Sequence, residues 1–77
     1  MIEKTIMLST IESVKEFVKI AANYDCEVDL VLGKYMVDAK SIMGIFSLDL
    51  TQPLTLRADC EADDKLAADI MPFIYRG

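Results

Sequence analysis

Histidine is absent from all 77 positions of the chain. Imidazole is the one side chain whose ordinary pKa lies near neutrality, and it is also the commonest metal ligand. Its absence excludes a carrier that holds a phosphoryl group on imidazole and every zinc site that uses a histidine. Any chemistry of this protein must therefore depend on other groups.

Cysteine is nearly as scarce, because Cys26 and Cys60 are the only two and lie far apart in the sequence. This spacing excludes a Cys-x-x-Cys redox motif and a zinc knuckle. We therefore expect no metal ion and no cofactor.

Positive charge is also limited, with eight Lys and Arg against 13 Asp and Glu and a net charge of −5. Contact with nucleic acid needs a surplus of basic residues on one face, so we expect no direct nucleic-acid partner. No apolar run approaches the ~18–20 residues that cross a bilayer, and the start of the chain lacks the pattern of a signal peptide. We expect one domain over residues 1–77, located in the cytoplasm and without a membrane partner.

Alternation of apolar and polar residues predicts strands. The clearest segment is 54–60, which places Leu54, Leu56, Ala58 and Cys60 on one face. Segments 2–8 and 26–32 alternate in the same way. Gly33 and Lys34 predict a turn, from which residues 35–37 return as the second strand of a hairpin.

Helical spacing of apolar residues predicts a helix over 10–22, whose inner face would comprise Ile11, Val14, Phe17, Val18 and Ala21. Ser9 and Glu12 have the form of a capping box at its start. A short helix over 40–46 has Ser41 as its N-cap. A last helix opens at Asp63 or Asp64, includes Leu66, Ala67, Ile70 and Met71, and ends or kinks near Met71 because Pro72 follows.

The predicted elements follow the order βαββαβα. Strands that alternate strictly have one packed face, and helices that cover that face complete a two-layer fold. We therefore expect an α+β protein, an open-faced sandwich with a four-stranded antiparallel sheet and three helices on one side.

The run Lys40-Ser41-Ile42-Met43-Gly44, followed by Ile45-Phe46-Ser47-Leu48, resembles the HPr family. These are the small phosphocarrier proteins of the bacterial sugar phosphotransferase system, and the match is to members from low-GC Gram-positive bacteria. The resemblance extends from Val14 to Met71. It implies the strand order 1-4-2-3.

The first helix departs from the family pattern, which places a phosphocarrier His, then Arg and Pro, at its start. Here the segment is shorter and reads Ser9-Thr10-Ile11-Glu12-Ser13. Glu12 falls near the place of the Arg, and a carboxylate there repels a phosphoryl dianion. We interpret Ser9, Thr10 and Glu12 as a degenerate phosphocarrier site. Phosphorylation of Ser9 or Thr10 would give an ester too stable for onward transfer.

Ser41 matches the serine that a regulatory kinase phosphorylates in Gram-positive HPr, where the phosphoserine form binds a transcriptional repressor. Members without the histidine but with this serine, the catabolite-repression HPr-like proteins, are the most similar subtype. Beside Ser41, the resemblance implies a partner-binding patch of Ile42, Met43 and Phe46. The simpler interpretation is that Ser41 only caps a helix and that the apolar residues are core, with Ile45 and Leu48 buried.

The implied strand order also brings Cys26 and Cys60 together, at the start of the second strand and the end of the fourth. Both would lie on the inward face. We expect neighbouring, buried and reduced thiols, since reduced cysteine is the default in the cytoplasm.

Three functions remain open at this point. The first is a regulatory or adaptor protein related to the phosphotransferase system, regulated at Ser41 and bound by an HPr-type kinase and a repressor. The second is an HPr scaffold redeployed as an unrelated protein-binding module without phosphorylation. The third, an enzyme or carrier with another nucleophile, has the least support, so we expect no enzyme.

Overall fold

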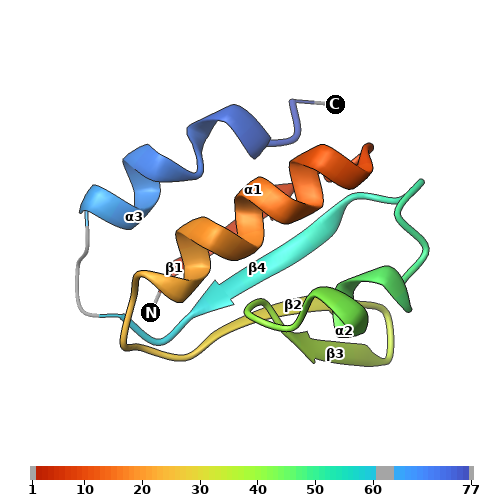
Figure 1. Cartoon of the computed structure of the whole chain (residues 1–77), viewed down its shortest axis with the longest axis horizontal. Coiled ribbons are helices and arrows are strands. Elements are labelled where there is room, and N and C mark those ends of the chain that lie inside the picture. The colour runs from red at the N-terminus through yellow and green to blue at the C-terminus, as the bar shows by residue number, and fades with distance from the viewer. Residues whose placement is uncertain (1, 61–63, 77) are drawn as a thin grey trace.

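The described part of the chain forms four strands and three α-helices in the predicted order βαββαβα (Figure 1). The computed structural model describes residues 2–60 and 64–76. The strands are β1 (Ile2–Ile6), β2 (Val28–Leu32), β3 (Tyr35–Asp38) and β4 (Leu54–Ala58), and the helices are α1 (Ile11–Ala22), α2 (Ile42–Phe46) and α3 (Asp64–Asp69). A short 3₁₀ helix, Met71–Phe73, follows α3. Within these described ranges, no helix has the length and apolar character needed to cross a membrane.

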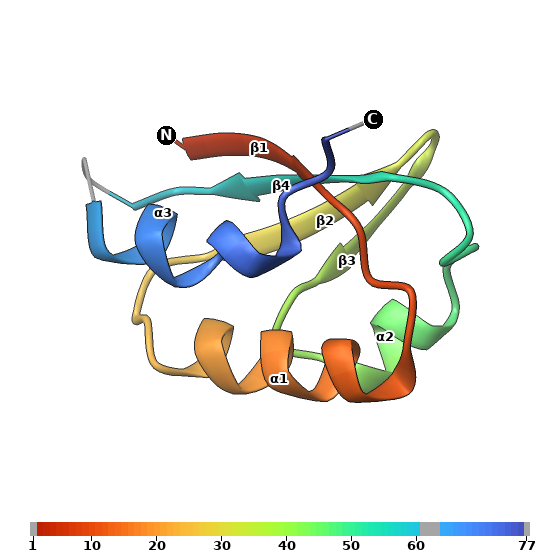
Figure 2. The same ribbon diagram turned by 90° about the horizontal axis from the view of Figure 1, so that it is seen from above.

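The sheet has the order β1-β4-β2-β3, and every neighbouring pair is antiparallel. Figure 2 shows α1, α2 and α3 on the same face of this sheet, which leaves the other face open. The predicted α+β open-faced sandwich with strand order 1-4-2-3 is therefore confirmed.

The core lies between the sheet and the helices, and β4 contributes to its centre as its alternation predicted. The buried residues from the strands and their ends are Ile6, Leu8, Val28, Leu30, Ala39, Leu54, Leu56, Ala58 and Cys60. Those from the helices and their ends are Val14, Phe17, Ala21, Tyr24, Ile45, Leu48, Leu66, Ile70 and Phe73. Each fully buried large aliphatic side chain contributes about 1.5–3 kcal/mol by leaving water.

The start of α1 differs from the prediction. Thr10 is the N-cap, with extended backbone angles, and forms a capping box with Ser13 rather than the predicted box of Ser9 and Glu12. Because the helix begins at Ile11, that side chain lies in the first turn on the outer side and is 63% exposed. The prediction that Ile11 faces the core is therefore wrong.

The last helix ends earlier than predicted. α3 stops at Asp69, and Met71 lies in the 3₁₀ helix that contains Pro72 near its start. Proline has no amide hydrogen to donate and its ring fixes φ, so it suits the first turn of a new helix and not the interior of α3. The alternative start at Asp63 lies outside the described residues.

Gly33 forms the predicted turn between β2 and β3 and has a φ of 60°. Residues with a Cβ rarely adopt this left-handed conformation, so the tight hairpin requires glycine at this position. The hairpin pairs Leu32 with Tyr35 and Leu30 with Val37.

Cys26 and Cys60 are neighbours, as predicted, but they form a disulfide bond and are not reduced. Their Cα atoms are 5.3 Å apart, within the range of disulfides. Both residues lie two positions beyond the last paired residues of β2 and β4, Val28 and Ala58, and a hydrogen bond of 2.8 Å from the Asp59 N–H to the Glu27 carbonyl continues the pairing toward them. Cys60 is buried, whereas Cys26 lies outside β2 and is only partly buried.

Candidate functional site

Ser41 is the N-cap of α2, as predicted. Its backbone is extended, with φ −102° and ψ 104°, and its Oγ accepts a hydrogen bond of 3.1 Å from the backbone N–H of Gly44. The residue is partly exposed. A Cβ at Gly44 would lie 3.2 Å from Ser41 Oγ and 3.3 Å from Val37 Cβ, so glycine permits this close approach between the first turn of α2 and its cap.

Replacement of Ser41 by Ala should lower the free energy of unfolding by about 1 kcal/mol, since the Gly44 N–H loses its acceptor. Urea denaturation followed by circular dichroism measures the change. The control is Ser9→Ala, an exposed position just before the N-cap of α1, with an expected change within about 0.5 kcal/mol. Equal effects of the two substitutions would show that the Ser41 cap contributes nothing.

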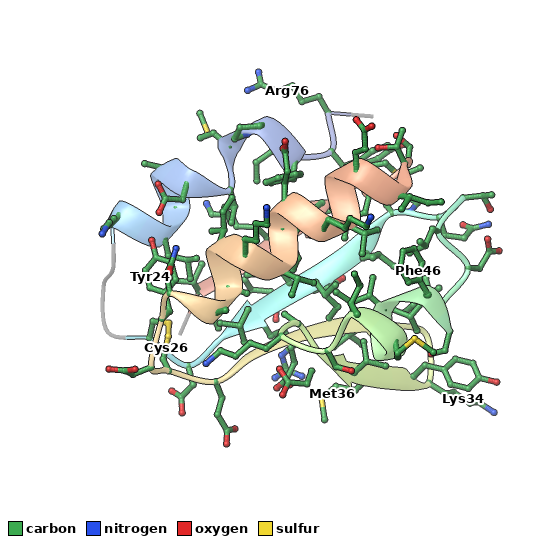
Figure 3. The ribbon with its side chains drawn as sticks, viewed as in Figure 1. Tyr24, Cys26, Lys34, Met36, Phe46 and Arg76 are labelled. Atoms are coloured by element: carbon green, nitrogen blue, oxygen red, sulfur yellow. A yellow bond between two sulfur atoms is a disulfide. The ribbon has the colours of Figure 1, made fainter. Side chains whose placement is uncertain are left out.

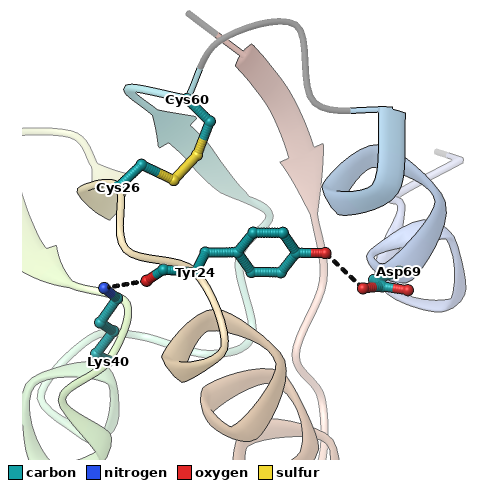
Figure 4. The surroundings of a disulfide bond; sticks show 5 residues. All are labelled: Tyr24, Cys26, Lys40, Cys60 and Asp69. Atoms are coloured by element: carbon teal, nitrogen blue, oxygen red, sulfur yellow. Dashed lines mark hydrogen bonds between the residues drawn. A yellow bond between two sulfur atoms is a disulfide. The ribbon is translucent and has the colours of Figure 1, made fainter.

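Lys40, next to Ser41, is fixed by contacts that the sequence did not reveal. Its Nζ donates a hydrogen bond of 2.6 Å to the carbonyl of Tyr24, and its backbone N–H donates one of 2.8 Å to Asp38 Oδ1. The hydroxyl of Tyr24 donates to Asp69 Oδ2 at 2.5 Å (Figure 4). One tyrosine thus links the end of α1 to α3 and to the residue that precedes the cap of α2.

The three residues of the predicted partner-binding patch differ in exposure. Met43 is 77% exposed and Phe46 is 40% exposed, whereas Ile42 is partly buried against the core. The predicted burial of Ile45 and Leu48 is confirmed, at 0% and 8% exposure. The short helix therefore has a buried side and an outer side that presents two large apolar side chains.

Two further exposed apolar residues lie on β3, the strand that contacts α2: Tyr35 at 70% and Met36 at 63% exposure. Figure 3 labels Met36 and Phe46 in this region. Neither residue was predicted from the sequence to belong to a binding surface. Alternation within β3 predicts that only one of two adjacent side chains is exposed, so it could have identified one of these two. Both are exposed in this four-residue strand because the hairpin forms the edge of the sheet.

The loop after α2 is also ordered by side-chain hydrogen bonds. Thr51 Oγ1 donates to Asp49 Oδ1 at 2.5 Å, and the Thr51 backbone N–H donates to the same oxygen at 3.1 Å. These two bonds, the side-chain bond first, lower the pKa of the Asp49 carboxyl below its ordinary value. Asp49 therefore contributes a fixed negative charge near the end of α2.

The residues predicted to form a degenerate phosphocarrier site, Ser9, Thr10 and Glu12, lie at the start of α1 and are all exposed. Thr10 Oγ1 accepts from the Ser13 N–H at 3.0 Å, and Ser13 Oγ donates to the Thr10 carbonyl at 2.7 Å. The hydroxyl groups of Thr10 and Ser13 therefore both take part in capping α1. Figures 1 and 2 show this first turn at the same end of the molecule as α2, with which α1 is in contact.

Comparison with known proteins agrees with this geometry. The family model described as the phosphorylation site of the HPr component of the phosphotransferase system matches residues 12–74. A search of curated protein sequences gave no match.

Solved structures give closer parallels. HPr-C-His from Thermoanaerobacter tengcongensis is 26% identical, with a TM-score of 0.79 over 96% of this chain and 91% of its own. The Bacillus subtilis catabolite repression containing protein Crh is 30% identical, with a TM-score of 0.62 over 95% and 88%, and its crystal structure is an intertwined dimer with a swapped domain. The phosphocarrier HPr of Bacillus anthracis, 19% identical with a TM-score of 0.71 over 96% of each chain, shares the fold.

The family model covers well over half of the chain, and its match includes both the cap of α2 and most of α1. The strand order and the three helices on one face are those expected of the same family. This chain therefore belongs to the HPr family of the phosphotransferase system.

Proposed function

We propose that this protein is a regulatory or adaptor member of the HPr family that does not carry phosphoryl groups and is not an enzyme. It works in the cytoplasm and binds other proteins through Ser41, through Met43 and Phe46 on the outer side of α2, and through the partly buried Ile42 beside them. Its partners are an HPr-type kinase and a transcriptional repressor. The observation that carries the proposal is the partly exposed Ser41 cap beside exposed Met43 and Phe46.

The residues at the start of α1 support the proposal that this protein does not carry phosphoryl groups. A carrier needs a nucleophile and positive groups around the phosphoryl oxygens. The chain has no histidine, and its only arginines, Arg57 and Arg76, lie on β4 and near the end of the described chain. Glu12 adds an exposed carboxylate in the first turn of α1. Negative charge there opposes the binding of a phosphoryl dianion.

The surroundings of Ser41 support phosphorylation at its hydroxyl. The first turn of α2 contains no acidic residue, and Gly44 presents a backbone N–H at 3.1 Å from Ser41 Oγ. A phosphate adds about −1.5 to −2 charges and three strong acceptor oxygens. Such a group would meet the Gly44 N–H and stand beside the two exposed apolar side chains, so a partner could recognise charge and apolar surface together. The 30% identity to a catabolite repression protein supports the same function.

Two parallel reactions test the proposal by intact mass. We expect the purified chain to gain one phosphate with an HPr kinase and ATP, and the Ser41→Ala variant to gain none. With phosphoenolpyruvate and the general phosphotransferase enzyme, we expect no phosphate on either.

The remaining outcomes decide between the alternatives. A chain that the kinase leaves unmodified, while it phosphorylates a Gram-positive HPr in the same tube, would favour a redeployed binding module. Acid-labile phosphate after the phosphoenolpyruvate reaction would show a carrier and overturn the proposal.

A further inference from the structure

The Cys26–Cys60 disulfide joins two residues that the sheet places opposite each other. β2 and β4 are antiparallel with Val28 opposite Ala58, and the Asp59 N–H donates to the Glu27 carbonyl at 2.8 Å. Two residues beyond the Val28–Ala58 pair, Cys26 and Cys60 therefore meet on the inward side (Figure 4). The antiparallel pairing of β2 and β4 therefore places the backbones of Cys26 and Cys60 close together, with their Cα atoms 5.3 Å apart.

The two cysteine residues differ in their exposure to solvent. Cys60 is 5% exposed and belongs to the core. Cys26 is partly exposed and lines a hollow of about 200 Å³ at the edge of the molecule. Thiol–disulfide exchange requires that a thiolate reach one sulfur of the bond, so access selects the sulfur that is attacked. A small thiol that enters the hollow meets Cys26 first.

The charge of this hollow is strongly negative. Among the residues that the structure describes, Asp25, Glu27, Asp29 and Asp38 line it, and Lys40 is the only basic residue of that lining. The Lys40 ammonium is held against the Tyr24 carbonyl at 2.6 Å. Four carboxylates against one ammonium give a local field that attracts cations and repels anions, and added salt screens that field.

We propose that Cys26 and Cys60 form a reversible thiol–disulfide site that reacts with low-molecular-weight thiols through Cys26 and prefers cationic or uncharged thiols to anionic ones.

In the reducing direction, a thiolate bonds to Cys26 Sγ, the bond between the two cysteine sulfurs breaks, and its electron pair leaves on Cys60 Sγ. A second thiolate then attacks the sulfur of the first reagent and releases the Cys26 thiolate. Two reagent thiols become one disulfide, and their two protons end on the two cysteines.

The oxidising direction is the reverse. The Cys26 thiolate attacks a small disulfide and releases one of its halves as a thiolate. The Cys60 thiolate then displaces the second half and restores the protein bond. In a reducing compartment the balance between the two directions follows the local pool of small thiols, so the state of the site reports on that pool.

The charge preference is tested with the oxidised full chain and three thiols: cysteamine, 2-mercaptoethanol and mercaptoacetate. Rates of reduction are measured by alkylation and intact mass, and each is divided by the rate on an unstructured peptide disulfide to remove the intrinsic reactivity of the reagent. At low salt we expect the ratio of the cysteamine rate to the mercaptoacetate rate to be about tenfold higher for the protein than for the peptide. At 1 M salt this ratio for the protein should approach the ratio for the peptide. A ratio equal to that of the peptide at low salt would overturn the charge preference.

Matched variants locate the origin of the charge effect. Asp25→Asn with Glu27→Gln removes two charges from the hollow and should reduce the ratio severalfold. Glu12→Gln with Glu16→Gln removes the same charge from exposed positions on α1, away from the hollow, and should leave it nearly unchanged. Equal effects of the two pairs would contradict a local field.

The attacked sulfur is identified by peptide mapping of the mixed disulfide that forms when wild-type oxidised protein meets one equivalent of reagent. We expect the adduct on Cys26. As a second measurement, 2-hydroxyethyl disulfide should modify the Cys60→Ser variant at least about tenfold faster than the Cys26→Ser variant, each checked for native circular dichroism. An adduct mainly on Cys60 would overturn the proposal. So would failure of the reduced wild-type chain to form the Cys26–Cys60 bond when it is treated with 2-hydroxyethyl disulfide.

Discussion

Reduction of the Cys26–Cys60 bond should lower the free energy of unfolding by about 4 kcal/mol. The cysteines are 34 residues apart, so the bond closes a loop that contains β2, β3, α2 and β4. A closed loop restricts the unfolded chain much more than the folded one, in which the sheet already places the two ends together. A domain of this size has a total stability of roughly 4–12 kcal/mol, so the loss would be a large fraction of it.

Urea denaturation with and without dithiothreitol measures this change. The Cys26→Ser/Cys60→Ser variant should have the stability of the reduced chain, and dithiothreitol should not alter it. The oxidised chain should also show a smaller m-value, because a cross-linked unfolded state exposes less surface. Identical midpoints for oxidised and reduced protein would contradict the prediction.

Phe17→Ala should cost about 3–5 kcal/mol. The Phe17 side chain is 1% exposed and lies edge-on to the ring of Phe73, with 5.7 Å between the ring centres and an angle of 85° between the planes. Its removal leaves a cavity between α1 and the 3₁₀ helix at the end of the chain, which loses the aromatic contact as well.

The control for this substitution is Ile11→Ala, on the same helix but 63% exposed, for which we expect a loss of less than about 0.5 kcal/mol. Chemical denaturation of both variants gives the comparison. Similar losses for Phe17→Ala and Ile11→Ala would mean that α1 is not anchored through Phe17.

The sequence predicted the fold well where one periodicity dominates a segment. Alternation over Leu54–Ala58 identified β4, and the spacing of Val14, Phe17 and Ala21 identified the buried face of α1. The ends of elements were less certain, because Ser9 and Thr10 are adjacent and either could cap the helix. Which of the two residues is the N-cap depends on the angle at which the chain enters the helix. Thr10 is the one that forms a capping box with Ser13.

The surroundings of the candidate site depended on contacts between distant segments. Ser41 was identifiable as a cap because the acceptor and its Gly44 donor are three residues apart. The hydrogen bond between Tyr24 and Asp69 joins residues that are 45 positions apart, and the one between Lys40 and Tyr24 joins residues 16 positions apart. No short sequence pattern predicts contacts over such separations. The proximity of the cysteines followed from strand order, but the bond between them depends on the approach of the sulfurs at the strand ends.

The residues after α3 also determine how the sheet can extend. Met7 N–H donates to the Phe73 carbonyl at 2.8 Å, Tyr75 N–H donates to the Thr5 carbonyl at 2.9 Å, and Ile6 is bridged to Ile74. The outer edge of β1 is therefore occupied near its end, while β3 forms the opposite edge of the sheet. Growth of a filament by strand addition needs two open edges on every subunit. Pairing with the edge of another sheet is therefore easier at β3 than at the end of β1, where the residues after α3 already take the place of a neighbouring strand.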